Sequence, residues 1–174
     1  MHQRILAKRI AELQNDDKIY LDLSFQSEER WNDKQRRKYV KSLLSNSCPT
    51  PIVLADVQSC MKYCEDTYGV DSADYLYFKD KDDTGWQYIS IDGNNRSRTI
   101  GRFVRNEFGL SPTEHKISGI EQPAYRNWKP TNSTRTYSAL PDFIKTHFDS
   151  NVCVIVYKVT EASLTDLCLS LIHI

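Results

Sequence analysis

Hydrophobic and polar residues alternate along this chain with two different periods. The period-two alternation of IYLDLSF (19–25) is typical of a strand with one buried face. Continuous or β-branched apolar runs indicate further, more deeply buried strands. Such runs occur at 51–57 (PIVLADV), 86–91 (WQYISI) and 151–159 (NVCVIVYKV).

Apolar residues three and four positions apart predict helices between these strands. At the N-terminus, Ile5, Leu6, Ile10 and Leu13 predict a helix over residues 3–14. Further helices are expected at 33–46, with Asp33 as N-cap, and at 57–69, 97–108 and 140–148. Because strands alternate with helices, the expected class is α/β or α+β, and the length of 174 residues indicates one domain.

The overall charge is balanced and excludes a general positive field. The chain is 40% hydrophobic and 26% charged, and its 23 Lys and Arg residues equal its 23 Asp and Glu residues. Any binding to nucleic acid must therefore come from a local basic patch. The chain has no apolar run of membrane-spanning length and no signal-peptide pattern, so we expect a cytoplasmic location and no membrane partner.

Five cysteines form no recognisable disulfide framework, and we expect them to be reduced. Cys60 and Cys64 lie four residues apart, on one face of the helix expected at 57–69. Zinc would need two more ligands, and His115 and His147 are distant in sequence and belong to no paired motif. We therefore favour structural thiols.

The segment YISIDGNNRSRTIGRFVRNEF (88–108) begins as a strand and ends as a helix. Gly93 can adopt backbone angles that a side chain forbids, so the chain can turn sharply there. The first turn of the helix then presents N–H groups without internal partners at the positive end of its dipole, which favours an anion. Arg96 adds a planar fork suited to phosphate oxygens, and Asn94 and Asn95 add amide groups.

The aspartate of this turn is the ambiguous residue. Asp92 would repel a phosphate directly, so it must hold Arg96, bind a metal ion or accept a sugar hydroxyl. The alternative is an ordinary capped helix, with Asp92 or Asn94 as the N-cap and Arg96 as a solvated charge. The residues of the turn leave both interpretations open.

A second polar and aromatic segment, FQSEERW (25–31), follows the first expected strand. Phe25 and Trp31 are either core aromatics or the wall of a site for a flat ring. In the second interpretation, Gln26 and Arg30 lie beside the polar edge of that ring.

In their order over residues 18–160, these features resemble the N-terminal domain of GmrSD-type, modification-dependent restriction enzymes, a branch of the ParB/sulfiredoxin-like superfamily. Phe25, Gln26 and Trp31 match the first family motif at its spacing. DGNNR (92–96) matches the glycine-to-arginine turn, with asparagines in place of two glutamines. The resemblance extends to SLLSNSCPTPIVLADV (42–57) and SALPDFIKTHFDSNVCVIVYKV (138–159). It implies an α+β fold, with a small mixed sheet and flanking helices.

The resemblance also implies nucleotide chemistry, because the Gly-x-x-Arg turn of this superfamily holds the phosphates of a nucleoside triphosphate, usually with Mg²⁺. Asp92 is then the expected metal ligand and the best catalytic carboxylate for hydrolysis. The expected nucleotide-binding residues are Gln26, Arg30, Trp31, Gly93, Asn94, Asn95 and Arg96.

Two departures from the family pattern bear on these roles. Ser27 stands where the family has an arginine, so Arg30 would substitute from another position. Asn94 stands where the sulfiredoxin branch has its cysteine, so sulfinic-acid reduction is not expected. Full-length family enzymes continue into a nuclease-type domain, which is an expected partner.

A DNA-binding or interaction module without catalysis is the alternative function. Phosphate contacts would come from two basic helices, whereas a solvated helix face explains the same charges. The cations are Lys34, Arg36, Arg37, Lys38 and Lys41 on the first helix and Arg98, Arg102 and Arg105 on the second.

The final residues raise a separate expectation. LSLIHI (169–174) resembles the translated end of a sequencing-library adapter. Residues 1–168 would then be a domain truncated at its C-terminus, and 169–174 an artefact. The alternative is a natural apolar tail that packs on the domain. Native coding sequence continuing past Cys168 through the same tail would reject the artefact.

Overall fold

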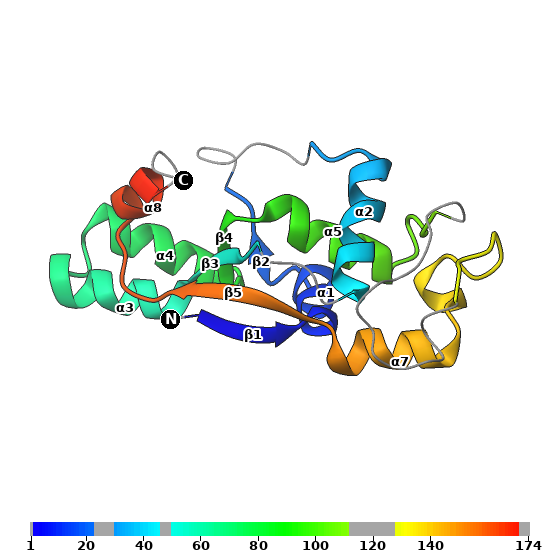
Figure 1. Cartoon of the computed structure of the whole chain (residues 1–174). Coiled ribbons are helices and arrows are strands. Elements are labelled where there is room, and N and C mark those ends of the chain that lie inside the picture. The colour runs from blue at the N-terminus through cyan, green and yellow to red at the C-terminus, as the bar shows by residue number, and fades with distance from the viewer. Residues whose placement is uncertain (1, 23–29, 46–49, 112–127, 171–174) are drawn as a thin grey trace.

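The computed structural model describes residues 2–22, 30–45, 50–111 and 128–170 (Figure 1). In these ranges the chain forms strands and helices that alternate for most of its length. In order they are β1 (His2–Leu6), α1 (Ala7–Asn15), β2 (Ile19–Tyr20), α2 (Asp33–Leu44), β3 (Ile52–Asp56), α3 (Val57–Tyr68), α4 (Ala73–Asp83), β4 (Tyr88–Asp92), α5 (Asn94–Val104), the 3-10 turn η1 (Tyr137–Ala139), α7 (Asp142–Asn151), β5 (Cys153–Val159) and α8 (Leu164–Ser170).

The five strands form one open, mixed sheet in the order β1-β5-β3-β4-β2. β3 pairs in parallel with β5 and antiparallel with β4, so both pairing modes meet at the central strand. β1 pairs antiparallel with β5 at one edge, and the short β2 pairs in parallel with β4 at the other. With seven helices in the described ranges, this is an α/β fold.

Helices cover both faces of the sheet, and the alternation of β3 residues shows which side chains face which layer. Ile52 and Leu54 belong to a core shared with α1, α2, α5 and α7. Ala55 belongs to a second core, which Cys60 of α3 and Phe78 of α4 also enter. Neighbouring strand residues point to opposite faces, so β3 contributes to two cores. In Figure 1, α3 and α4 lie to the left, and α1, α2, α5 and α7 lie to the right.

Several sequence expectations are confirmed. The helix expected at 33–46 is α2, and its apolar residues Tyr39, Val40, Leu43 and Leu44 are buried. The helix expected at 57–69 is α3, and Gly69 ends it with a φ of 86°. The runs at 51–57, 86–91 and 151–159 are β3, β4 and β5 within two residues at each end.

The single helix expected over residues 3–14 is wrong in its first half. Residues 2–6 are β1, whose main chain pairs with β5 from His2–Tyr157 to Leu6–Cys153. α1 begins only at Ala7. Ile5 and Leu6 matched helical spacing by coincidence, because hydrogen bonds to a distant strand decide the conformation here.

Other helix boundaries also differ from expectation. Asn32, not Asp33, is the N-cap of α2: its side chain accepts from the Gln35 N–H, while the Gln35 side chain accepts from the Asn32 N–H. α4 was not predicted, because the pattern of its residues is only weakly amphipathic. α5 begins at Asn94, three residues earlier than expected.

The strand expected at 19–25 is present as β2 at Ile19–Tyr20, and Gln26 lies outside the described residues. In the described ranges, no helix combines the length and apolar character needed to cross a bilayer.

Candidate functional site

Gly93 turns the chain from β4 into α5. Its φ of 90° and ψ of 17° are left-handed, a conformation that side chains disfavour. The space is also closed, because a Cβ at this position would lie 3.0 Å from the Ile52 Cα and 3.1 Å from Arg96 Nε. Glycine is therefore required here for its backbone angles, as the sequence predicted, and also for the close approach of β3.

Asp92 and Arg96 face each other across the first turn of α5. Asp92 Oδ1 accepts the Gly93 N–H at 2.6 Å, and Oδ2 accepts from Arg96 Nη2 at 2.7 Å. The Arg96 side chain is 14% exposed and the Asp92 side chain 38%. Of the roles expected for Asp92, holding Arg96 is the one this geometry supports, since each carboxylate oxygen already accepts a hydrogen bond.

Two buried donors at the turn have no partner among the described residues. They are Nε of Arg96 and Nδ2 of Asn94, whose residue is 6% exposed. Burying a polar group without a hydrogen bond usually costs about 1–3 kcal/mol. Both groups donate, and they lie beside first-turn N–H groups that also have no acceptor within the helix. The turn is thus rich in donors, which suits an anion.

Asn95 connects the turn to the segment before α2. Its Oδ1 accepts the N–H of Arg30 at 3.0 Å and that of Trp31 at 3.3 Å. The sequence placed the aromatic segment and the glycine turn in one site, and the structure brings Arg30, Trp31 and Asn95 together. The contact runs through the main chain of Arg30 and Trp31, which sequence reasoning did not foresee.

The ring of Trp31 packs into the protein. It meets the Tyr39 ring at a centroid distance of 5.3 Å and lies against the core formed with α2 and α5. This is the core-aromatic role given as the alternative for Trp31. The Arg30 residue is exposed at the start of its described segment.

The cations predicted for DNA binding on α2 are partly neutralised within the helix. Asp33 pairs with Arg36 at 2.8 Å and with Arg37 at 3.6 Å. Lys41 lies in the last turn of α2, where a cation complements the helix dipole. These contacts favour a charged, self-paired helix face over a free row of phosphate contacts.

The described residues around Asp92 do not form a cluster of metal ligands. In the described ranges, no group of three or more His, Cys, Asp or Glu side chains is placed to hold a metal ion. The Arg96 guanidinium beside Asp92 would also repel a cation. The residues present therefore do not fit a metal held by Asp92 alone.

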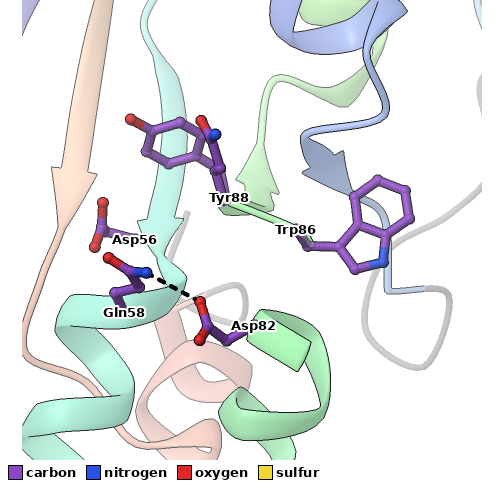
Figure 2. Close-up of a pocket in the computed structure, with 6 residues that line it drawn as sticks. Asp56, Gln58, Asp82, Trp86 and Tyr88 are labelled. Atoms are coloured by element: carbon purple, nitrogen blue, oxygen red, sulfur yellow. Dashed lines mark hydrogen bonds between the residues drawn. The ribbon is translucent and has the colours of Figure 1, made fainter. Parts of the chain in front are cut away.

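A cavity of about 250 Å³ opens at the opposite end of β4, where the strand begins. Figure 2 shows the carboxylates of Asp56 and Asp82 near the Gln58 side chain, with Tyr88 and Trp86 beyond them. Gln58 Nε2 donates to Asp82 Oδ1 at 3.2 Å. The remaining lining residue is Gln87, so polar groups and two aromatic rings share this hollow.

Asp56 in that cavity has a structural task. It caps α3 by accepting the Ser59 N–H at 2.8 Å, and it pairs with Lys158 at 2.7 Å. Burial alone would raise its pKa, but the hydrogen bonds from Lys158 and Ser59 outweigh burial and leave the pKa lowered. Its charge is therefore largely compensated.

A larger cavity of about 390 Å³ lies between α1 and α5. Its lining is polar and includes the three arginines that were predicted as the second basic helix. The residues are Gln14, Asn15, Asp17, Arg98, Arg102, Arg105 and Glu107. Neither this cavity nor the one at Asp56 is lined by Asp92, Gly93 or Arg96.

Comparisons with protein-family models, with curated proteins and with solved structures returned no match for this chain. The family resemblance therefore stays a hypothesis, carried by the motifs and by the local geometry of the turn.

Sequence reasoning missed the acidic and aromatic cavity and the polar residues of α1. Gln14 and Asn15 end an amphipathic helix, where polar residues are ordinary. Asp56, Gln58, Asp82 and Trp86 lie on different elements that only the folded chain brings together. Neither group has a local sequence signal.

Proposed function

We propose that the turn from β4 into α5 binds the phosphates of a nucleoside triphosphate, in a ParB-like domain of a DNA-processing or restriction protein. The observation that carries this proposal is the state of Arg96. Its guanidinium is held by Asp92, while its buried Nε and the buried Asn94 Nδ2 lack acceptors in the described ranges. A phosphate oxygen supplies such acceptors.

The fold is compatible with this assignment. A mixed sheet with flanking helices is what the family resemblance implies, although the observed class is α/β and not the expected α+β. The turn follows the end of a strand and opens a helix of eleven residues, the arrangement in which helix dipole and free N–H groups act on one anion.

Each residue of the turn then has a distinct task. Gly93 lets the main chain approach closely, and Arg96 provides charge and direction. Asn95 holds the Arg30–Trp31 segment against the turn, which places that segment beside the ligand. Asp92 orients Arg96 and does not contact the phosphate.

Magnesium enters the proposal with the nucleotide. Because Asp92 alone does not fit a metal ion, Mg²⁺ would be held mainly by phosphate oxygens, as it commonly is when a protein offers few carboxylates. The proposal covers binding. Hydrolysis additionally requires a positioned water and an offset of charge on the phosphate oxygens.

The test is a thermal-shift screen of nucleoside triphosphates with and without Mg²⁺, followed by calorimetric titration of any ligand found. A ligand that binds only the folded protein raises its melting temperature. We expect Arg96→Ala to abolish the shift. Lys62→Ala is the matched control, because Lys62 also pairs with an aspartate four residues away, on α3.

One result would separate a binding role of Arg96 from a purely structural role: the Arg96→Ala variant loses stability but still binds the nucleotide. If Arg96→Ala unfolds more easily but the nucleotide shift is unchanged, the Asp92–Arg96 pair only stabilises the start of α5. Absence of a shift with every nucleotide in the wild-type protein would also reject the proposal.

A further inference from the structure

The cavity between α1 and α5 contains three guanidinium groups on one helix face. Arg98, Arg102 and Arg105 are spaced four and three residues apart, so at about 100° per residue they fall within about 60° of one another around the helix. All three line the same hollow of about 390 Å³. From first to last they extend over about 10 Å along the helix axis.

Glu107 fixes the orientation of two of these side chains. Its Oε2 accepts from Arg102 Nε and its Oε1 from Arg105 Nε, both at 2.6 Å. One carboxylate therefore holds both guanidiniums by their Nε atoms. Burial tends to raise the pKa of Glu107, but the two arginines lower it overall, so it is ionised at neutral pH.

The end of α1 supplies the opposite wall. Asn15 Oδ1 accepts a hydrogen bond from Arg105 Nη1, and Gln14 Nε2 donates to Ser97 Oγ at 3.0 Å. The side chains of Gln14 and Asn15 thus tie α1 to α5 along the length of the cavity. Asp17 is the second carboxylate of the lining, so three guanidiniums face two carboxylates and leave one positive charge in excess.

Arg98 shows that this is more than a cluster of ion pairs. It makes no hydrogen bond or ion pair with any residue that the structure describes. It also lies in the middle of α5, so the negative end of the helix dipole does not explain it. An oriented pair of arginines beside a third without a partner is the arrangement that phosphate oxygens satisfy.

We propose that the cavity between α1 and α5 binds compounds with several phosphate groups through Arg98, Arg102 and Arg105, as a second anion site. Several phosphates in a row fit the three guanidiniums better than one does, because these extend along the helix. Arg98 is two residues from Arg96 and therefore about 200° away around α5, so the two sites face different directions. The inference does not depend on nucleotide binding at the Gly93 turn.

Two sources of such phosphates are distinguished by two probes. One is a short, fluorescein-labelled single-stranded DNA, followed by fluorescence polarisation. The other is inorganic tripolyphosphate, followed by calorimetry. Both are titrated without Mg²⁺ into wild-type and Arg96→Ala protein, so that any contribution of the Gly93 turn is measured separately.

The variants are Arg98→Ala, Arg102→Ala and the double substitution. Arg98→Ala removes no described contact, so its folding is expected to be intact. Each lost phosphate contact should weaken binding on the order of tenfold at low salt, and should reduce the slope of log K against log salt by roughly one. Arg9→Ala is the matched control, because it also removes an arginine that pairs with a glutamate, Glu12, but one that does not line the cavity.

The outcomes divide clearly. Loss of DNA binding in the double variant, with Arg96→Ala unchanged, supports the site and identifies a nucleic-acid strand as its ligand. Loss of tripolyphosphate binding alone identifies free phosphate compounds. The proposal is overturned if wild-type protein binds neither probe, if the double variant binds like wild type, or if Arg9→Ala weakens binding equally.

Discussion

The side-chain oxygen of Asn95 accepts hydrogen bonds from the main-chain N–H groups of both Arg30 and Trp31. These residues precede Asn95 by 65 and 64 positions in the sequence. This contact fixes the segment before α2 against the first turn of α5. The α2 and α5 helices also share one core, so the connection joins two elements that already pack together.

Replacing Asn95 separates the structural role of this contact from its role in binding. Asn95→Ala should lower the free energy of unfolding by about 1 kcal/mol, because two hydrogen bonds are lost to partly exposed groups. Asn95→Asp keeps the acceptor and should be close to wild type in stability. Its added charge should nevertheless reduce the thermal shift caused by a nucleoside triphosphate. Equal shifts for Asn95→Asp and wild type would contradict a phosphate at this turn.

Replacing Gly93 by alanine should lower the free energy of unfolding for two reasons, backbone strain and steric contact. The same replacement at a second glycine separates the two. Gly93 and Gly85 have positive φ values of 90° and 87°, so alanine should cost about 1–2 kcal/mol at either position from its backbone angles. At Gly85 a Cβ makes only an ordinary contact with Lys18 Nζ at 3.8 Å, whereas at Gly93 it meets β3 and Arg96 more closely. Urea denaturation should therefore show a larger loss for Gly93→Ala. Equal losses would mean that the close approach to Ile52 is relieved without cost.

The Asp56–Lys158 pair should make stability depend on pH. The hydrogen bonds to Asp56 lower its pKa from the usual 3.8 despite burial. Because this pKa is lower in the folded protein, ionised Asp56 stabilises the fold at pH values above its unfolded pKa. The contribution is lost as the pH falls through the folded pKa. Asp56→Asn should cost about 1–3 kcal/mol at neutral pH.

The measurement is urea denaturation of the wild-type protein and of Asp56→Asn from neutral to acidic pH. The difference in unfolding free energy should shrink once the pH falls below about 4, since protonated Asp56 no longer pairs with Lys158. A difference that stays constant to strongly acidic pH would assign the effect to altered packing or to the helix cap alone.

The thiols of Cys60 and Cys64 should be chemically inert in the folded protein. Burial raises the pKa of Cys60 to about 12 and that of Cys64 to about 11, and their Sγ atoms donate to the carbonyls of Val159 and Ala162. Because the thiolate is the reactive form, alkylation at mildly alkaline pH should be slow. Cys153 and Cys168 are less buried and should react first.

Peptide mass spectrometry after timed alkylation checks this order. In denaturant all cysteines should react at similar rates, which provides the control. Early modification of Cys60 or Cys64 in native buffer would show that α3 and α4 open more readily than their buried core suggests.

The strands and helices that carry a strong local pattern were predictable. The β-branched runs of β3 and β5 and the apolar faces of α2 and α3 follow from side-chain period alone. The first six residues were not predictable in this way, because β1 exists only through pairing with β5, about 150 positions away. α4 was missed because Phe78 is its one buried residue.

The candidate site was likewise only partly predictable from the sequence. The conformation of Gly93 and the helix start could be inferred from residue types, and the Asp92–Arg96 pair was one of the roles considered. The contacts of Asn95 could not be inferred from residue types, because they join segments that are far apart in the sequence. The arginine face of α5 was visible in the sequence, but not the carboxylate of Glu107 that orients it.

The outermost position of β1 has a practical consequence for handling the protein. β1 shields one side of β5, whose residues Val154 and Val156 are buried in the core. A bulky tag or a deletion that displaced His2–Leu6 would uncover the main-chain donors and acceptors of that strand to neighbouring molecules. Uncovered edges of this kind recruit other chains, so preparations altered at this end are the ones most prone to precipitate.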